Sequence, residues 1–385
     1  MTDVSRRELL KLTGTAAGGG AITYAATNGR ARFDREEEDE TTTPRGGARS
    51  LPSDSALARE NTYFVPPADG IGGIQAVIDD HAPDVTVVLG SGTYVGSELT
   101  VRHDVRLIGA GVNATTLKLA DGANTDLVVT PNPDRRASLR VRMEHLTCDG
   151  NKAHNSTGDI VYGVFWNGRF VDCEFVDAPT NGFWLAGSPN ASTDNNVFRN
   201  CLFARSKGNG LRLGGSRTTG AAVGVARIDT CWFGRNGGDA MQIRGNGNFV
   251  TSGKFYENAG TDVYIDRGHR NLVLDSDLSK PIPTAPCISV RSAKGVDSSG
   301  NRIAGNVIYG SFPDAVFCRA DGNDVRSLQI QNNMIDGSGE GTRTGIRAVG
   351  GEYIGCVAQG NAVVGSFSEA AIQLPSSWTT TGNSA

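Results

Sequence analysis

Short runs of alternating apolar and polar residues recur along the second half of the chain, from about Phe170 to Leu374. The first unit begins at Phe170 and closes with Gly-Phe-Trp-Leu185, and the pattern is then repeated to give eight units in all. Each unit holds one anchoring apolar residue: Phe175, Phe203, Phe233, Phe255, Leu278, Ile308, Ile335 and Val363. Self-similarity at a period of roughly 20–30 residues, in short alternating runs, predicts a solenoid of β-strands.

The segment before these units predicts a helix and then more short strands. Ile71, Ile74, Val77 and Ile78 have helical spacing, which predicts a short amphipathic helix. We expect this helix to cover the open end of the solenoid, where exposed strand edges would otherwise invite aggregation. Runs of alternating apolar residues follow at 85–89, 92–94, 99–101, 105–109 and 116–119. They are too short for an ordinary sheet and fit the coils of a β-helix.

Several of these runs carry a resemblance to a known family. Ile74-Gln-Ala-Val-Ile78, Gly92-Thr-Tyr94 and Leu107-Ile-Gly-Ala-Gly111 are similar to the opening of the pectin-lyase-like superfamily, and the likeness covers roughly residues 63–376. The resemblance implies an all-β fold, a single-stranded right-handed parallel β-helix (a solenoid) with an N-terminal capping helix. The superfamily includes lyases, hydrolases, epimerases and non-catalytic surface proteins, so the fold alone does not fix a reaction.

The repeats also predict which residues stack at one bend. Two residues before each anchor lies a column of small or amide side chains: Cys173, Cys201, Cys231, Gly253, Ser276, Asn306, Asn333 and Asn361. Stacked strands rise about 4.8 Å per coil, so members of a column lie directly above one another. The three asparagines resemble the asparagine ladder of the superfamily, and their amides are expected to bond along the stack. We interpret the three cysteines as a buried thiol stack rather than metal ligands.

The strand after the bend predicts an outward-facing column. Its first and third residues are apolar and point inward by the period-two rule, so the residues between them point out. These outward residues are Trp184, Arg212, Gln242, Tyr264, Ser289, Phe317, Arg347 and Gln373. A second outward column two positions further on contains Arg244, Asp266, Arg291 and Arg319. In the superfamily this strand lines the saccharide cleft, and Trp184, Arg212, Gln242, Arg291 and Arg319 are therefore predicted to bind substrate.

A third column, just before this strand, is predicted to face outward as well. It reads Gly182, Gly210, Ala240, Asp262, Cys287, Ala315, Gly345 and Ala371, so that one carboxylate stands among small residues. Asp239 lies one coil and one residue from Asp262, which would put their α-carbons about 6 Å apart. This pair is a candidate for glycoside hydrolysis, in which two carboxylates flank the bond. Asn181 and Asn209 stand where a standard polygalacturonase would need acids.

The alternative chemistry is β-elimination next to a uronate carboxylate. A cation neutralises that carboxylate while a Tyr, Lys, Arg or His removes the proton beside it. Arginine suits this task because its planar fork matches a carboxylate. Tyr264, Arg244 and Asp266 are candidate catalytic residues for this reaction, with Asp266 bracketed by Arg244 and Arg291. Calcium is a candidate helper through Asp239, Asp262 or Asp266, although no calcium-loop motif is present and no dedicated metal site is predicted.

A structural interpretation competes with both reactions. Alternating Arg and Asp on adjacent strands is ordinary cross-strand pairing, and Trp184 would also suit packing under a loop. The leading hypothesis is an exported polysaccharide lyase acting on an acidic polysaccharide. A hydrolase or uronate epimerase on the same cleft comes next, and a non-catalytic glycan-binding or structural surface protein is the alternative from another class.

The ends of the chain and its composition complete the picture. Residues 1–33, with Arg6-Arg7 before a Gly/Ala-rich run, resemble a twin-arginine export signal, which predicts an extracellular or cell-surface protein. Residues 34–60 are predicted to be an acidic disordered linker, residues 61–378 the β-helix domain and residues 379–385 a tail. A net charge of −4 argues against a nucleic-acid partner, and the apolar run is too glycine-rich for a stable membrane span. The oligomeric state is left open.

Overall fold

The computed structural model describes residues 49–50, 61–131, 138–190, 193–218, 220–280 and 283–385. The predicted export signal and nearly all of the predicted linker lie outside these residues. Within the described part, strands dominate, and α2 (Gly70–His81) and the short 3-10 turn η1 (Pro67–Asp69) are the two helical elements. None of the described helices is long and apolar enough to cross a membrane.

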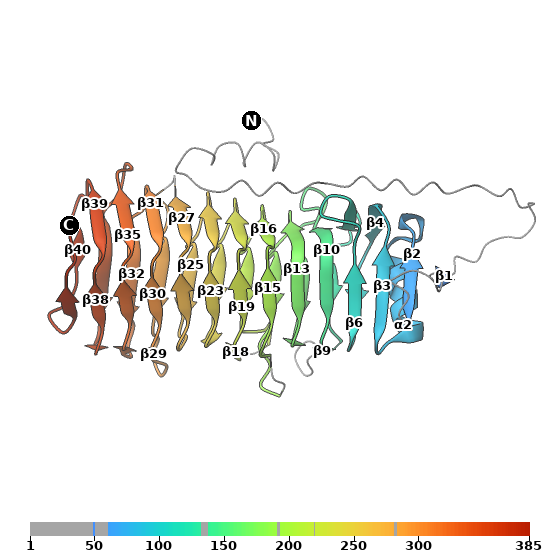
Figure 1. Cartoon of the computed structure of the whole chain (residues 1–385), viewed down its shortest axis with the longest axis horizontal. Helices are drawn as coiled ribbons and strands as arrows, with labels where there is room; N and C mark the ends of the chain where they lie inside the picture. Colours follow the sequence, from blue (N-terminus) through green and yellow to red (C-terminus); the bar gives the residue numbers. More distant parts are fainter. Residues whose placement is uncertain (1–48, 51–60, 132–137, 191–192, 219, 281–282) are drawn as a thin grey trace, which may run out of the picture. The chain divides into compact units, whose positions relative to one another are not determined.

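The predicted capping helix is confirmed. Ile71, Ile74, Val77 and Ile78 are all buried on one side of α2. The helix packs against the first strands of the β-helix, β2 (Thr62–Val65), β3 (Val85–Leu89), β4 (Gly92–Gly96) and β5 (Leu99–Thr100). Figure 1 shows it at the N-terminal end of the stack of coils. It therefore covers apolar ends of coils that would otherwise face water.

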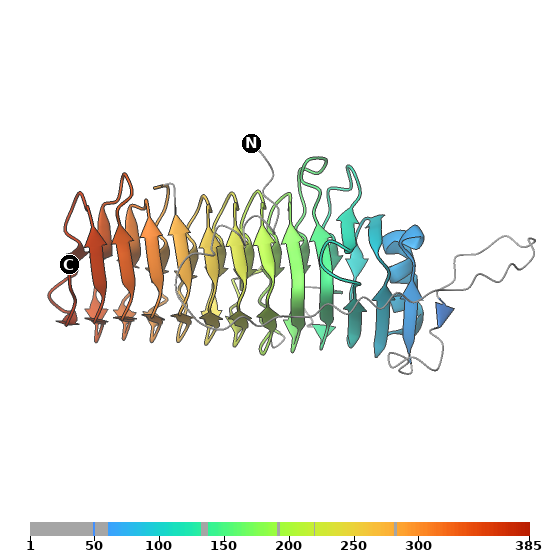
Figure 2. The same cartoon turned by 45° about the horizontal axis from the view of Figure 1, so that its top comes forward.

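Most coils contribute two strands to a large sheet, sheet A, and one strand to a second sheet, sheet B. In two coils a single long strand, β10 (Arg142–Asp149) or β13 (Arg169–Val176), takes the place of the two sheet A strands. A typical coil contains β19 (Arg227–Asp229), β20 (Trp232–Gly234) and β21 (Met241–Ile243). These pair in parallel with the corresponding strands of the next coil, β23 (Phe249–Thr251), β24 (Lys254–Tyr256) and β25 (Val263–Asp266). The coils follow one another in chain order, as the colours of Figures 1 and 2 show. The predicted parallel solenoid is confirmed.

Sheet B has 11 strands and carries the face predicted to bind substrate. In chain order they are β5, β8 (Val128–Val129), β11 (Val161–Gly163), β14 (Phe183–Leu185), β17 (Leu211–Leu213), β21, β25, β28 (Ile288–Arg291), β32 (Asp314–Ala320), β36 (Thr344–Gly350) and β40 (Ile372–Gln373). In β17 and β21 the outer two residues are buried and the middle one is not. This is the period-two pattern predicted from the sequence.

The other strands of the coils belong to sheet A. Its other strands are β1 (Arg49–Ser50), β6 (Val105–Ile108), β7 (Thr115–Leu119), β10 (Arg142–Asp149), β13 (Arg169–Val176), β15 (Val197–Arg199), β16 (Leu202–Ala204), β26 (Leu272–Leu274), β27 (Asp277–Lys280), β30 (Arg302–Ala304), β31 (Val307–Gly310), β34 (Gln329–Gln331), β35 (Met334–Gly337), β38 (Val357–Gln359), β39 (Ala362–Gly365) and β41 (Thr379–Thr381). Further short strands form small sheets separate from sheets A and B. In these sheets β9 (Ser138–Leu139) pairs with β12 (Phe165–Trp166), β18 (Val223–Gly224) pairs with β22 (Gly245–Asn246), and β33 (Val325–Arg326) pairs with both β29 (Ser298–Ser299) and β37 (Tyr353–Ile354).

Identical side chains stack in the interior along the coils. Phe175, Phe203, Phe233 and Phe255 are buried, and the centroids of successive rings lie 5.2, 5.0 and 4.8 Å apart. The spacing is close to the separation of hydrogen-bonded strands, because each ring projects from the same position of consecutive coils. The anchoring residues of the sequence repeat are thus the core of the solenoid.

The predicted bend column forms a hydrogen-bonded ladder. The Oδ1 of Asn333 accepts hydrogen bonds from the backbone N and the Nδ2 of Asn306, and Asn333 donates to Asn361 in the same way. In the earlier coils, Cys173, Cys201 and Cys231 occupy this position as buried free thiols. The asparagine ladder and the thiol stack are both confirmed, and burial raises the pKa of the Cys173 and Cys231 thiols.

The β-helix extends beyond the predicted boundary at residue 378. Strand β41 pairs in parallel with β38, and Asn383 Oδ1 accepts hydrogen bonds from the backbone N and the Nδ2 of Asn361. The predicted tail therefore adds part of another coil. It was missed because three threonines and an asparagine carry no apolar anchor. At the other end, β1 lies within the predicted linker and pairs antiparallel with β2.

Candidate functional site

The predicted outward column of sheet B is confirmed by the strand register. Trp184 pairs with Arg212, Arg212 with Gln242, and Gln242 with Tyr264, so the four residues stand in consecutive coils. The column continues through Ser289, Phe317, Arg347 and Gln373. It also begins earlier than predicted, because Tyr162 is the register partner of Trp184 one coil before it.

Five arginines gather on the middle of this face: Arg212, Arg244, Arg267, Arg291 and Arg319. We call them the arginine face, together with Asp266 and Asp321, the two carboxylates that all of them except Arg212 contact. Five guanidinium groups against two carboxylates give this surface a net positive charge, which suits an anionic ligand. Phe317 and Arg347 continue the same outward column beyond it.

The ion pairs of the arginine face differ from those predicted. Asp266 accepts hydrogen bonds from Arg244 at 2.6 Å and from its neighbour Arg267 at 2.8 Å. Arg291 is its register partner in the next coil, as predicted, but the second ion pair of Asp266 is with Arg267. Arg291 instead contacts Asp321 at 2.7 Å. Asp321 lies just after β32 and belongs to no sequence column. Arg291 is thus paired with Asp321 and not with Asp266. Burial by itself would raise the pKa of Asp266, but the hydrogen bonds and charges of Arg267 and Arg244 outweigh burial and lower that pKa.

Tyr264 lies at the centre of this arrangement. The Nη1 of Arg291 donates a hydrogen bond to the Tyr264 hydroxyl oxygen at 3.4 Å. Hydrogen bonds to Tyr264 and Asp321 raise the pKa of the Arg291 guanidinium. Gln242 and Ser289 flank Tyr264 on the neighbouring strands. The structure therefore brings a phenol, a guanidinium and an amide together on one open strand face.

Asp239 belongs to a ladder rather than to a catalytic pair. Its Oδ1 accepts a hydrogen bond from the backbone N of Thr261 at 2.8 Å, and its own backbone N donates to Asn209 Oδ1. The same link joins Asn209 to Asn181, Asn181 to Asp159 and Asp159 to Asp126. Each side-chain oxygen accepts the backbone N–H of the next coil. This role explains why short Asp and Asn side chains recur at this position, and burial raises the pKa of Asp239.

The prediction that Asp262 faces outward is wrong. Asp262 is 0% exposed, and its Oδ1 accepts a hydrogen bond from Asn258 Nδ2 at 3.0 Å. Burial raises its pKa to about 6, although the buried cation Lys280 acts in the opposite direction. Because a saccharide has no access to this carboxylate, the two-carboxylate hydrolase site is not formed by Asp239 and Asp262. The pair was inferred from period-two alternation, which does not hold in the turn before the strand.

The small residues of that column are small for a packing reason. A β-carbon at Gly182 would lie 2.5 Å from the carbonyl oxygen of Gly210, and one at Gly210 would lie 2.7 Å from that of Ala240. Consecutive coils approach too closely here for larger side chains. The column therefore marks a tight turn in the interior and not a floor for substrate.

Trp184 is also less accessible than predicted. It is 7% exposed, and its indole N–H donates to the carbonyl oxygens of Gly214 and Gly215. The guanidinium carbon of Arg212 lies 3.9 Å from the centre of its ring, and Tyr162 packs edge-on at 5.1 Å. Arg212 makes no ion pair within the described ranges, and burial, followed by repulsion from Arg244, lowers its pKa. Trp184 thus supports Arg212 and leaves little ring surface for a sugar.

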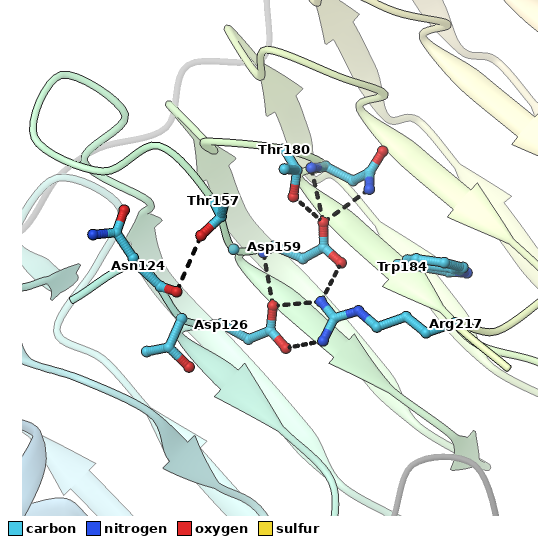
Figure 3. Close-up of a pocket in the computed structure, with 10 residues that line it drawn as sticks. Asn124, Asp126, Thr157, Asp159, Thr180, Trp184 and Arg217 are labelled. Carbon is cyan, nitrogen blue, oxygen red and sulfur yellow. Dashed lines mark hydrogen bonds and ion pairs between the residues drawn. The ribbon is translucent and has the colours of Figure 1, made fainter. Parts of the chain in front are cut away.

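A pocket of about 430 Å³ opens beside Trp184 at the N-terminal side of the arginine face. It is lined by Asn124, Thr125, Asp126, Thr157, Gly158, Asp159, Thr180, Asn181, Trp184 and Arg217. Figure 3 shows the Arg217 side chain reaching across to Asp126 and Asp159. The pocket therefore includes two acidic members of the Asp/Asn ladder, Asp126 and Asp159, and one arginine from a distant loop.

Arg217 is held by two carboxylates at once. Its Nη2 lies 2.7 Å from Asp126 Oδ1 and 3.0 Å from Asp159 Oδ2, and its Nη1 lies 2.9 Å from Asp126 Oδ2. Burial alone would lower the pKa of the Arg217 guanidinium, but the hydrogen bonds and charges of Asp126 and Asp159 outweigh it and raise that pKa. Asp159 also accepts hydrogen bonds from the Thr180 hydroxyl and from Asn181. Asp159 is therefore bonded to Arg217, Thr180 and Asn181 at once.

Comparison with known proteins agrees with this architecture. Residues 190–364 match the family model described as "Right handed beta helix region". The described residues thus fold as a right-handed parallel β-helix. The resemblance to the pectin-lyase-like superfamily is thereby confirmed at the level of the fold. No curated protein matches the chain in sequence.

Solved structures with the same fold include enzymes of carbohydrates. The A-module of the Azotobacter vinelandii mannuronan C-5 epimerase AlgE4 superposes with a TM-score of 0.64 at 16% identity, covering 83% of this β-helix protein and 94% of that chain. The AlgE6 A-module of the same organism gives 0.57 at 20% identity, with 81% and 94% covered. The catalytic unit of a GH87 alpha-1,3-glucanase from Streptomyces thermodiastaticus gives 0.56 at 14% identity, with 88% and 70% covered. At these identities the likeness establishes the fold alone.

Three charged residues of the pocket were missed by sequence reasoning. Asp126 and Asp159 precede sheet B strands by two residues, as Asn181, Asn209 and Asp239 do, so extending that column toward the N-terminus would have found them. Arg217 lies in an insert between β17 and β18 and shares no position with any repeat. Nothing in the sequence pattern predicts which residues Arg217 contacts.

The carboxylates predicted to hold calcium are already engaged. Asp266 is bonded to Arg244 and Arg267, Asp239 accepts the Thr261 N–H, and Asp262 is fully buried. Nowhere in the described ranges do three or more His, Cys, Asp or Glu side chains gather as metal ligands. These residues do not fit a calcium site, and the calcium requirement stays a prediction from the sequence.

Proposed function

We propose that this β-helix protein acts on an acidic, uronate-containing polysaccharide and cleaves it by β-elimination on the arginine face. The observation that carries the proposal is the contact between Tyr264 and Arg291 in the centre of a strand face with a net positive charge. Asp239 and Asp262, which a hydrolase would need, are a ladder residue and a buried residue. Proton abstraction is therefore favoured over hydrolysis.

The arginines meet the first requirement of the elimination, a positive charge beside the uronate carboxylate. The ring proton beside a uronate carboxylate becomes acidic only when the negative charge that develops on that carboxylate is stabilised. Arg212 lacks an acidic partner in the described part of the chain, and Arg291 and Arg319 share one carboxylate, that of Asp321. Bidentate guanidinium groups recognise carboxylates well, so these three side chains are the ones assigned to bind uronates.

Tyr264 is assigned the proton transfer. Its oxygen takes the proton from the ring carbon beside the carboxylate, and the electron pair forms the new carbon–carbon double bond as the bond to the leaving sugar oxygen breaks. That oxygen must then be protonated, and the same phenol is placed to return the proton. Arg291 is given the role of holding this phenol in position through its hydrogen bond and of facing the charge that develops on the substrate.

Uronate epimerisation is the second candidate, because it begins with the same proton abstraction. It ends with a proton delivered to the opposite face of the ring and with no bond to the neighbouring sugar broken. The two solved structures described as mannuronan C-5 epimerases support this candidate through their shared fold. A non-catalytic glycan-binding protein would use the arginine face without needing Tyr264.

We also propose that the reaction takes place outside the cell. The paired arginines and the Gly/Ala-rich run at residues 1–33 resemble an export signal for folded proteins, so we assign the activity to the cell surface or the surrounding medium. A polymeric substrate that does not enter cells fits that location.

The test uses the whole protein with polymannuronate, polyguluronate and polygalacturonate, each with and without calcium, in deuterated water. Elimination gives ultraviolet absorbance from unsaturated ends together with new reducing ends. Epimerisation gives deuterium at the ring carbon beside the carboxylate without either signal. Reducing ends without absorbance would mean hydrolysis and would overturn the proposal. Binding without any of the three signals would leave the glycan-binding protein as the correct description.

A further inference from the structure

The outward face of sheet B is covered over β11 and β14 and becomes more exposed at β17, β21 and β25. Tyr162 and Trp184, the outward residues of β11 and β14, are 2% and 7% exposed. In contrast, Gln242 and Tyr264, the outward residues of β21 and β25, are only partly buried. A saccharide chain lying along the arginine face therefore meets a covered surface as it approaches β14.

The cover is a segment that we call the strap, residues 214–218. Gly214 and Gly215 have φ angles of +85° and +65°, which glycine adopts readily, and they turn the chain back after β17. A β-carbon at Gly214 would lie 1.9 Å from the carbonyl oxygen of Arg244, so this turn requires glycine. The Gly215 carbonyl then accepts hydrogen bonds from Gly187 N and from the indole N–H of Trp184.

Arg217 fastens the strap across two earlier coils. Its backbone N donates to the Tyr162 hydroxyl at 3.1 Å, and its guanidinium carbon lies 4.1 Å from the centre of the Tyr162 ring. The Asp126 and Asp159 side chains that bind this guanidinium are 7% and 2% exposed. Charge-assisted bonds to poorly hydrated carboxylates are among the stronger polar contacts, so the strap is held firmly in place.

The pocket beside the strap meets the arginine face at Trp184. Trp184 lines the pocket and also carries the Arg212 guanidinium on its ring. The charge changes sign between the two: the pocket has two carboxylates against the one guanidinium of Arg217, whereas the arginine face has an excess of cations. Thr125, Thr157 and Asn181 add hydroxyl and amide groups to the pocket wall. This lining suits the hydroxyl groups of a sugar better than its carboxylate.

We propose that the strap is an end stop and that the pocket holds the terminal sugar of the chain. One terminus of a uronate polysaccharide then lies in the pocket through its hydroxyl groups, and the following uronates lie on the arginine face. The protein consequently binds and processes the polymer from one chain end. This inference rests on the proposed function, because it assumes a uronate chain on that face.

The test compares oligomannuronate, oligoguluronate and oligogalacturonate that are free at both ends with the same oligosaccharides carrying a bulky aromatic group at one terminus. Binding to the whole protein is measured by calorimetry. Blocking one specific terminus should weaken binding at least about tenfold, and blocking the other should leave it within about twofold. Equal affinity for both blocked forms, or an equal loss for both, overturns the end stop while the proposed function stands. If no uronate oligosaccharide binds, the proposed function itself fails, and the end stop fails with it.

Two variants connect the end preference to the strap. Arg217→Ala should remove most of the difference between the two blocked oligosaccharides, whereas Arg205→Ala, which breaks an ion pair with Asp177 away from sheet B, should not. Since Arg217→Ala leaves two buried carboxylates, its folding is checked by thermal melting. Thr157→Trp alters an exposed position and keeps the ion pairs, and it should weaken binding of the free oligosaccharide about tenfold by filling the pocket. If Thr157→Trp and a folded Arg217→Ala both bind like the native protein, the assignment is wrong.

Discussion

Replacing Tyr264 by Phe removes a single oxygen atom from the centre of the arginine face. That oxygen accepts one described hydrogen bond, from Arg291 Nη1 at 3.4 Å, and the ring itself stays in its column between Gln242 and Ser289. A long hydrogen bond at a partly exposed site contributes about 1 kcal/mol or less to the free energy of unfolding. The variant should therefore fold and melt almost as the native protein does.

The expected loss of activity is much larger than this loss of stability. A positioned general base contributes roughly 10²–10⁴-fold to the rate, which is about 3–5 kcal/mol of activation free energy. Binding should change little, because the arginines that hold the uronate carboxylates are untouched. Tyr264→Phe should thus lower kcat by about two to four orders of magnitude and leave Kd for oligouronates within about threefold.

The assay follows unsaturated ends by ultraviolet absorbance, deuterium incorporation by mass spectrometry and Kd by calorimetry. Tyr309→Phe is the matched control, since Tyr309 is an exposed tyrosine on β31 of sheet A and lies outside the candidate site. The reasoning is refuted if Tyr264→Phe keeps more than about a third of the native rate, or if its rate falls only in step with its melting temperature.

Three further predictions test the surrounding structure. The pKa of Asp262 is about 6 in the folded protein against an ordinary 3.8, so the folded state binds this proton more tightly than the unfolded chain does. The bound proton therefore adds about 3 kcal/mol to the free energy of unfolding below pH 3.8, and this stabilisation is lost as the pH rises through 6. Thermal melts should show that slope in the native protein and not in Asp262→Asn, and the variant should keep its activity, which a hydrolase using Asp262 would not. Asn333→Ala should destabilise the C-terminal coils by about 3–6 kcal/mol in denaturant titrations, because it orphans buried partners such as Asn306 and the Ile303 carbonyl; a loss below about 1 kcal/mol would contradict the role of the ladder. Finally, Kd for oligouronates should rise steeply between low and physiological salt, as expected for five guanidinium groups, and salt-independent binding would argue for a neutral glycan instead.

The outward column from Trp184 to Gln373 could be predicted from the sequence because a β-helix is locally determined. Each strand repeats at nearly the same position of its coil, and alternation along the strand decides which side chain is buried. The capping helix and the bend ladder were predictable for the same reason, since both depend on spacing along the chain. Tyr264, Arg291 and Arg319 were therefore assigned to the correct face without a structure.

The tertiary structure decided the features that do not follow the repeat. Asp262 was expected on the surface because alternation was extended into a turn, where the close approach of two coils buries it instead. Arg291 contacts Asp321 rather than Asp266. Asp321 lies just after the end of β32, where the strand register no longer predicts which side chains meet. Arg217 crosses back over two coils to reach Asp126 and Asp159, 91 and 58 positions earlier in the chain. An insert carries no period, so only the folded chain reveals that it closes one end of the face.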